Sequence, residues 1–348
     1  MTAAGRRRGG GQAADARAVG DRAADASAVG ARAASNRAAS DRATGGPDAR
    51  AVERAVAAIP ALVATPGGLL VVCDFDGTLA PISPDPTAPT ILPPARRALR
   101  RLARIARRRP ERLALAILSG RAALDLAGRV RVGGMTYLGD HGSQGGDLPI
   151  GVAAERLKVV HDPRLSGHQE VARRLAADVE RLLADAPWLY VEPKGPSVAF
   201  HFRATDDIVD ARARVLSAIA EADAALPPAL RGPRFRHLEG RRIVELRPED
   251  AGAKGDAVAR LLERHGSTAA LVIGDDRTDA EAFRRVTGER RSGRLAASLL
   301  LGVHGARETP AELLAAADVI LPEPAASAIV LRALARTLEA EERPHRER

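Results

Sequence analysis

The chain has 348 residues, of which 45% are hydrophobic and 28% are charged. That length allows one large or two medium domains with a buried core. No apolar run reaches 18 residues, which excludes a transmembrane helix, and we expect no membrane partner. The single cysteine, Cys73, excludes a disulfide framework and a cysteine-based zinc site. It is compatible with a reducing compartment, and we expect a cytoplasmic protein.

The net charge of +9 suggests a nucleic-acid partner, but the distribution of charge does not. All but three of the 53 basic residues are arginines, and they are mixed with acidic residues along the chain. Such mixing is typical of a compositional bias rather than of a binding stripe. Aromatic residues make up only 2% of the chain, too few for a surface that stacks bases. We therefore expect no nucleic-acid partner.

Residues 1–50 are predicted to be a disordered, Ala/Arg-rich tail. Residues 1–48 contain no Leu, Ile or aromatic side chain, so they cannot bury an apolar face that would offset the entropy of ordering. They also lack the apolar centre of a secretory signal.

Beyond residue 50, the pattern predicts helices that alternate with strands. The predicted elements are a helix over 51–63, a strand over 69–73, a helix over 93–109, a strand over 113–118, a helix over 122–128 and a strand over 136–138. A further strand, 269–273, precedes a helix that starts near residue 279. Uninterrupted apolar strands that alternate with helices predict a parallel sheet covered on both faces.

The middle of the chain has a different pattern. It predicts a helix over 167–185, extended segments over 189–192 and 197–203, a helix over 207–225 and a further segment over 234–246. Val198, Phe200 and Phe202 alternate with other residues, which is typical of a half-exposed strand. We therefore predict an α+β cap over 146–240, inserted between two parts of the core at 51–145 and 241–340. Two crossings between core and cap would allow hinge closure.

Two carboxylates follow the first predicted strand. Asp74 and Asp76 precede Gly77, and the carboxyl end of a parallel strand is where such sheets bind ligands. Residues i and i+2 of an extended segment share a face, and glycine allows a tight turn beside a ligand. An isolated pair of this kind is usually a polar strand end, but the full segment DFDGTL after an apolar strand favours a reactive site.

Two further segments carry groups suited to phosphate. Ser119, Gly120 and Arg121 follow the second strand, where a hydroxyl and free N–H groups at a helix entry can cradle phosphate. Serine is also a common helix N-cap, so a purely structural role for Ser119 is an alternative interpretation. Lys254 is one of three lysines in an arginine-rich chain, which indicates either a need for a compact ammonium or chance.

Three acids crowd the loop after the strand at 269–273. Asp275, Asp276 and Asp279 would repel one another unless a cation or bound partners compensated them. Oxygen ligands indicate Mg²⁺ rather than zinc. The alternative is a solvated acidic turn.

Together these segments resemble the haloacid dehalogenase superfamily of aspartyl phosphotransferases, over about residues 66–340. More closely, the chain resembles the trehalose-6-phosphate phosphatase family. The narrower match rests on DFDGTLAPI (74–82), LSGR (118–121), GDHG (139–142), EPKGPSVAFHFR (192–203), and ELRP with KGDA and GDDRTDAEAF (245–257 and 274–283). One departure is Asp140, where the family more often carries Ser or Asn. The resemblance implies a Rossmann-like parallel-sheet core with the cap inserted in it.

The resemblance also implies roles for the core residues. Asp74 would be the nucleophile, and Asp76 the general acid and base. Ser119 and Lys254 would stabilise the phosphoryl oxygens. Asp74, the backbone carbonyl of Asp76, and Asp275 would hold Mg²⁺, and the remaining acids of that loop would orient them.

For substrate contacts, the resemblance implies a set of polar side chains drawn mainly from the cap. They are Arg121, His141, Glu192, Lys194, His201 and Arg203. Two other readings stay open: Glu192 and Lys194 as a surface ion pair, and Arg203 in a salt bridge with nearby acids. The implied partner is a small-molecule sugar phosphate, and we expect a monomer.

The reaction implied is the Mg²⁺-dependent hydrolysis of trehalose 6-phosphate to trehalose and phosphate through an aspartyl-phosphate. Another sugar phosphatase of the superfamily, acting for example on glucosyl- or mannosyl-glycerate phosphate, is the near alternative, and a mutase is a third. A regulatory subunit without turnover, whose tail binds an anionic partner, is the alternative from a different class.

Overall fold

The computed structural model describes residues 47–83, 85, 87–240, 242–304 and 309–342. The chain divides into two units, residues 1–50 and 51–348. The predicted tail at 1–50 therefore lies almost wholly outside the described residues. Among the residues that are described, no helix has the length and apolar character needed to cross a membrane.

Eight strands form one sheet, in the order β12-β11-β10-β1-β2-β3-β4-β5. The first six are parallel, whereas β4 and β5 run antiparallel at one edge. The strands are β1 (Gly68–Cys73), β2 (Leu113–Leu118), β3 (Met135–Gly139), β4 (Gln144–Leu148), β5 (Val160–His161), β10 (Ser267–Gly274), β11 (Ala297–Val303) and β12 (Val319–Leu321). The predicted parallel core is confirmed.

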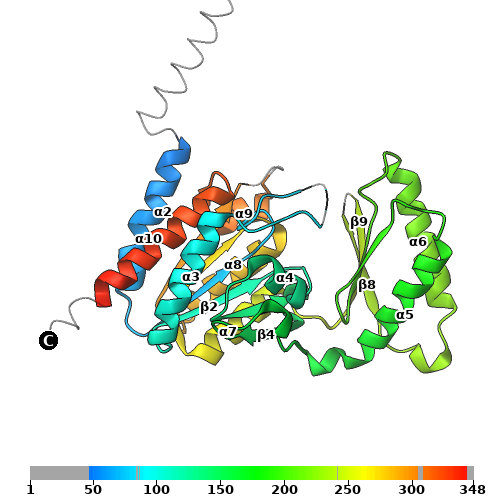
Figure 1. The fold of residues 1–348 in the computed structure, drawn as a ribbon, viewed down its shortest axis with the longest axis horizontal. Helices are drawn as coiled ribbons and strands as arrows, with labels where there is room; N and C mark the ends of the chain where they lie inside the picture. Colours follow the sequence, from blue (N-terminus) through cyan, green and yellow to red (C-terminus); the bar gives the residue numbers. More distant parts are fainter. Residues whose placement is uncertain (1–46, 84, 86, 241, 305–308, 343–348) are drawn as a thin grey trace, which may run out of the picture. The chain divides into compact units, whose positions relative to one another are not determined.

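Helices cover both faces of this sheet (Figure 1). On β1, Leu69 and Val71 pack with α2 (Pro47–Val63), α3 (Pro93–Arg108), α4 (Ala123–Val130) and α10 (Pro324–Glu342). Leu70 and Val72 point to the opposite face and pack with α7 (Lys254–His265), α8 (Arg277–Arg291) and α9 (Ala311–Ala316). Every residue of β1 is buried, which explains why its apolar run is uninterrupted.

The middle of the chain forms a separate four-stranded antiparallel sheet, in the order β6-β7-β9-β8. Its strands are β6 (Tyr190–Pro193), β7 (Val198–His201), β8 (Phe235–Gly240) and β9 (Ile243–Pro248). Two helices, α5 (Ser166–Leu182) and α6 (Ile208–Ala224), share one apolar cluster with its strands. Short 3-10 turns complete the described elements: η1 (Asp140–Gly142), η2 (Ala154–Arg156), η3 (Pro163–Leu165) and η4 (Pro228–Leu230). The predicted α+β character of the insert is confirmed.

Two details of the insert differ from the sequence-based expectation. The strand β7 is buried on both faces rather than half-exposed. Val198 and Phe200 on one face belong to the apolar cluster shared with α5 and α6, and the other face carries His201 toward a polar cavity. The segment 234–246 is divided between two strands, β8 and β9. The chain leaves the large sheet after β5, which ends at His161, and returns to it after β9, which ends at Pro248. The predicted cap limits were 146 and 240. Where the cap begins and ends as a folding unit stays a prediction.

Candidate active site

Three neighbouring parallel strands deliver polar side chains to one edge of the large sheet. β1 lies between β2 and β10, and their carboxyl ends are followed by Asp74, Ser119 and Asp275. The strand register therefore brings together residues that are as many as 201 positions apart in the chain. Asp74 and Ser119 are almost fully buried.

Lys254 lies at the centre of this edge, at the start of α7. Its Nζ is 2.8 Å from Asp74 Oδ1 and 2.8 Å from Asp279 Oδ1. The lysine is 1% exposed, so this ion-pair network is almost shielded from water. The sequence-predicted nucleophile and the sequence-predicted ammonium are thus in direct contact.

The turn after Asp74 is shaped by the acidic loop opposite. Gly77 has a φ of +76°, and a Cβ there would lie 2.0 Å from Asp275 Oδ2. Because no other residue type fits both the backbone angle and the space, the glycine lets the Asp275 carboxylate approach the backbone beside Asp76. The DxDGT segment and the GDD segment are therefore two halves of one packed site.

Substitution of Gly77 tests that packing. We expect Gly77→Ala to cost about 1–3 kcal/mol of unfolding free energy through backbone strain and to displace Asp275. Gly128→Ala is the matched control, since a Cβ at this position in α4 meets nothing within 4 Å. Denaturant unfolding of both variants checks the prediction, and equal stabilities for the two would contradict it.

The remaining acids of the loop are engaged in the first turn of α8. Asp276 caps the helix and accepts a hydrogen bond from the Asp279 backbone N–H at 2.9 Å. Asp279 Oδ2 accepts hydrogen bonds from the backbone N–H groups of Asp275 and Asp276, at 3.0 and 3.2 Å. Both oxygens of Asp279 therefore have partners, one the backbone and the other Lys254. This arrangement suits an orienting role.

The site holds more negative than positive charge. Carboxylate oxygens of Asp74, Asp275 and Asp279 lie within 4.8 Å of one another. Burial, together with the neighbouring carboxylates, raises the pKa of Asp74 and of Asp275 well above the ordinary value, although Lys254 counteracts the rise. An all-oxygen donor set with excess negative charge fits a hard divalent cation. This buried cluster of aspartates could hold a metal ion.

Arg121 makes a bidentate ion pair with Asp76. The distances are 2.6 Å from Nε to Oδ2 and 2.8 Å from Nη2 to Oδ1. Burial opposes the charge on the guanidinium, but Asp76 and Asp125 nevertheless hold the pKa of Arg121 above its usual value. The structure thus places Arg121 in the site and engages it with Asp76.

Cap side chains complete the site from the opposite wall. His201 Nε2 is 2.9 Å from Glu192 Oε2, and Lys194 Nζ is 3.2 Å from Glu245 Oε2. Arg203 donates to the carbonyl of Ser83 at 3.0 Å. Lys194 also pairs with Glu192, at 4.0 Å, but Lys194 is only 5% exposed, so this ion pair is buried rather than on the surface.

A cavity of about 560 Å³ contains the whole predicted set. Its lining includes every site residue predicted from the sequence. They are Asp74, Asp76, Ser119, Arg121, His141, Glu192, Lys194, His201, Arg203, Lys254 and Asp275. That volume lies within the range of sites for small molecules.

Glu245 is a charged residue of the cavity wall that the sequence analysis did not predict. It lies on β9 beside Lys194, is 8% exposed and lines the same cavity. The signal was present, because the polar Glu245 stands between the buried Val244 and Leu246 in a strand. That alternation puts its side chain on the face of the sheet that carries His201.

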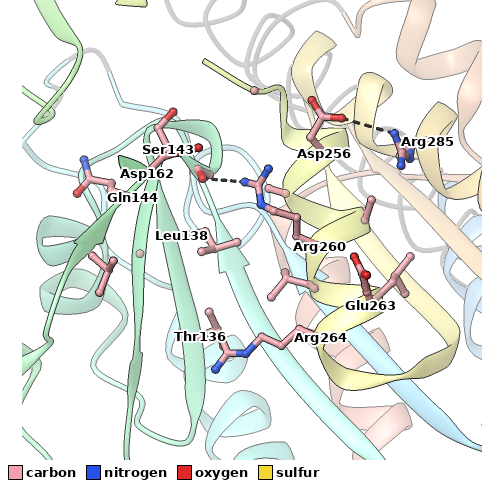
Figure 2. A pocket seen from close by; sticks show the side chains of 18 of the residues that line it. Thr136, Leu138, Ser143, Gln144, Asp162, Asp256, Arg260, Glu263, Arg264 and Arg285 are labelled. Carbon is pink, nitrogen blue, oxygen red and sulfur yellow. Dashed lines mark hydrogen bonds and ion pairs between the residues drawn. The ribbon is translucent and has the colours of Figure 1, made fainter. Parts of the chain in front are cut away.

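A larger hollow of about 1900 Å³ lies elsewhere, along α7 and the β3–β5 edge, and contains none of the predicted site residues. Figure 2 shows Arg260 and Arg264 directed from α7 toward this edge. Charges within the hollow neutralise one another, as in the pairs of Arg264 with Asp147 and Arg285 with Asp256. We assign the chemistry to the smaller cavity.

Comparison with known proteins agrees with this site. Residues 72–313 match the family model described as trehalose-phosphatase, which covers well over half of the chain. The chain belongs to the trehalose-phosphatase family.

Relatives in the family are found in distant organisms. A trehalose-phosphate phosphatase of Mycobacterium bovis (strain BCG) is 34% identical over 215 residues, or 60% of this chain and 49% of that protein. A probable trehalose-phosphate phosphatase 9 of Oryza sativa subsp. japonica is 32% identical over 239 residues, or 62% of this chain and 59% of that protein. The match thus spans about half the length of the Mycobacterium relative.

A solved structure shares the fold. The C-terminal domain of Candida albicans trehalose-6-phosphate phosphatase aligns with a TM-score of 0.60 at 20% identity, over 81% of this chain and 96% of that one. This likeness supports the α/β core with its separate antiparallel sheet. At 20% identity this likeness concerns the fold, and the chemistry of the present chain is argued from its own site residues.

Proposed function

We propose that this chain hydrolyses trehalose 6-phosphate to trehalose and phosphate, through a phosphoryl group carried by Asp74. One observation supports the proposal most strongly. The Lys254 ammonium lies between Asp74 and Asp279 at the floor of a cavity whose opposite wall carries Lys194, Glu192 and other groups suited to sugar hydroxyls.

In the first step, a carboxylate oxygen of Asp74 attacks phosphorus, and the bond from phosphorus to the sugar oxygen breaks. Asp76 gives its proton to the departing oxygen. Lys254 and the Ser119 hydroxyl stabilise the phosphoryl oxygens, since both line the cavity beside Asp74. The products are trehalose and an aspartyl-phosphate.

In the second step, water attacks phosphorus and Asp76 takes its proton, so that Asp74 leaves as a free carboxylate. Asp76 has both oxygens engaged by Arg121 in the structure. To transfer a proton it must exchange one of these contacts for the substrate oxygen. Arg121 is then the group that holds Asp76 in the cavity between turnovers.

Two anions, a carboxylate and a phosphate ester, must meet in this mechanism, and their repulsion is costly in a buried site. The residues that would hold Mg²⁺ are Asp74, the carbonyl of Asp76, and Asp275. When bound, Mg²⁺ would neutralise charge and polarise the phosphoryl oxygens. Asp279 accepts hydrogen bonds from the Lys254 ammonium and from the Asp275 backbone N–H, and so holds Lys254 and the acidic loop close to each other.

The cap residues account for recognition of the sugar. Burial alone would raise the pKa of Glu192, but Lys194 and the hydrogen bond with His201 lower it to about 2, so Glu192 is an ionised acceptor at neutral pH. Although burial opposes its charge, Glu245 and Glu192 hold the pKa of Lys194 above its usual value, so Lys194 is a charged donor. Fixed donors and acceptors in a buried wall discriminate strongly between hydroxyl patterns.

A substrate panel tests the proposal. We expect the protein to release phosphate from trehalose 6-phosphate at least about 100-fold faster than from glucose 6-phosphate, because only the disaccharide reaches the whole cap wall. The panel includes glucosyl- and mannosyl-glycerate phosphate. Equal rates on all sugars would overturn the disaccharide assignment, and preference for a glycerate ester would favour the neighbouring activity.

Metal dependence is a separate prediction. Treatment with a chelator should abolish phosphate release, and Mg²⁺ should restore it. Ca²⁺ should not, because its longer bonds and looser geometry misplace the phosphoryl group. Full activity after exhaustive chelation would contradict a metal role for the aspartate cluster.

A further inference from the structure

The hairpin of the cap that carries two of the proposed recognition residues is hydrogen-bonded to core residues 140–144. The hairpin comprises β6, β7 and their connecting turn at 194–197, which the bond from the Lys194 N–H to the Ser197 carbonyl closes at 2.9 Å. Lys194 and Glu192 belong to this hairpin. The position of its tip therefore determines the positions of Glu192 and Lys194.

Two core side chains hold the tip, one at each end of the turn. Asp140 Oδ2 accepts a hydrogen bond from Ser197 Oγ at 2.8 Å, and both side chains are fully buried. Gln144 Nε2 donates to the Lys194 carbonyl, while its Oε1 accepts from the backbone N–H of Ala123. Figure 2 shows Gln144 on the side of the sheet edge away from α7.

The backbone between these two side chains is strained. Asp140 and His141 both have positive φ, 47° and 55°, and Gly142 follows at 98°. Left-handed non-glycine residues cost free energy and persist only where their surroundings require them. Here the turn directs His141 against Gly120 beside the phosphate cradle and Asp140 toward the cap.

The fit at the tip itself is close. Gly195 has a φ of +81°, and a Cβ there would lie 2.7 Å from the His161 ring.

Asp140 Oδ1 has no partner among the described residues. Burying an acid without a full set of partners costs free energy, which indicates that its position serves the site.

We propose that Asp140 is a positioning residue: it docks the β6–β7 hairpin onto the core and thereby sets Lys194 over the reaction centre. The proposal rests on the function proposed above. Asp140 contacts Ser197 and is not among the residues that line the cavity, so its effect reaches the reaction through Lys194. Loss of the contact loosens the grip on sugar without changing the chemistry at Asp74.

Charge around Asp140 adds a pH dependence. Burial raises the pKa of Asp140 to about 6; Glu245 adds to the rise, whereas Lys194, the Ser197 hydrogen bond and Arg247 oppose it. These charges, with His141 beside it, are the groups that face Asp140. When the hairpin lifts and Asp140 meets water, its pKa returns toward the ordinary value. The docked form therefore binds the proton more tightly, and docking strengthens as the pH falls through 6.

The test compares two substrates. Asp140→Ala and Ser197→Ala should each raise KM for trehalose 6-phosphate about 10-fold, and the double variant should show no more than either alone. Hydrolysis of p-nitrophenyl phosphate, which has no sugar to contact the cap, should change less than about 2-fold. Asp140→Asn should restore the wild-type KM at pH 5.5 and remove its rise toward pH 7.5.

The matched control is Asp147→Ala, on the same β4 edge, because the Asp147 partners Thr136 and Arg264 both belong to the core. Equal losses on both substrates, or losses that multiply in the double variant, would overturn the proposal. Hydrogen exchange gives a readout that needs no turnover: the amides of Lys194, Gly195 and Ser197 should lose protection in Asp140→Ala but keep it in Asp147→Ala. Wild-type protein inactive on both substrates would instead reject the proposed function.

Discussion

Asp74→Asn is expected to abolish phosphate release, by about 10⁴-fold or more in kcat. The amide cannot attack phosphorus, so the covalent route is closed, while the cavity and its binding groups remain. The shape of the site should survive, because an amide oxygen can still accept the hydrogen bond from Lys254 that Asp74 Oδ1 accepts now.

The stability of the Asp74→Asn variant shows whether its activity is lost through chemistry or through misfolding. Burial already disfavours the ionised form of Asp74, as its raised pKa indicates. The Asp74→Asn variant should therefore unfold at no lower denaturant concentration than the wild type in a metal-free buffer. Initial rates and denaturant unfolding check both halves. Residual activity above a hundredth of wild type would contradict the nucleophile assignment.

Lys254→Met is expected to lose both activity and stability. The lysine is the one ammonium among the described residues that contacts Asp74 and Asp279, so its loss leaves buried carboxylates without compensation. Breaking a buried ion pair on one side costs about 3–5 kcal/mol of unfolding free energy. Loss of a charge-stabilising donor lowers kcat by about 10²–10³-fold.

A second measurement shows whether charge is the cause. Mg²⁺ should recover more stability in Lys254→Met than in wild type, because the variant has more uncompensated negative charge. The matched control is Lys158→Met, an exposed lysine outside the cavity, which should change neither property. A Lys254→Met protein as stable as wild type would contradict the view that this ammonium neutralises the acidic floor.

The core of the fold and the floor of the site were predictable because each depends on local pattern and on one rule of parallel sheets. The uninterrupted apolar runs at β1, β2 and β10 predict buried parallel strands, and polar residues directly after them must meet at one edge. The contact between Lys254 and Asp74 required the motif resemblance as well, since 180 residues separate them.

Other features depend on tertiary contacts that no local pattern reveals. The strand β4 was not predicted, because its two glycines have low strand propensity; they are needed because a Cβ at Gly145 would lie 2.5 Å from the Tyr137 carbonyl. The full burial of β7 follows from the cap helices that pack on one face and the cavity wall on the other, which alternation along one strand cannot show. The docking of Ser197 on Asp140 joins two segments whose sequences carry no sign of each other.

The role of Asp74 as carrier of the phosphoryl group is tested most directly by quenching the protein in acid during turnover of trehalose 6-phosphate and mapping modified peptides by mass spectrometry. We expect a gain of one phosphoryl group on the peptide that contains Asp74, present during turnover and absent once substrate is exhausted. Phosphate release at full rate with no phosphorylated peptide, or with the group on another residue, would contradict it.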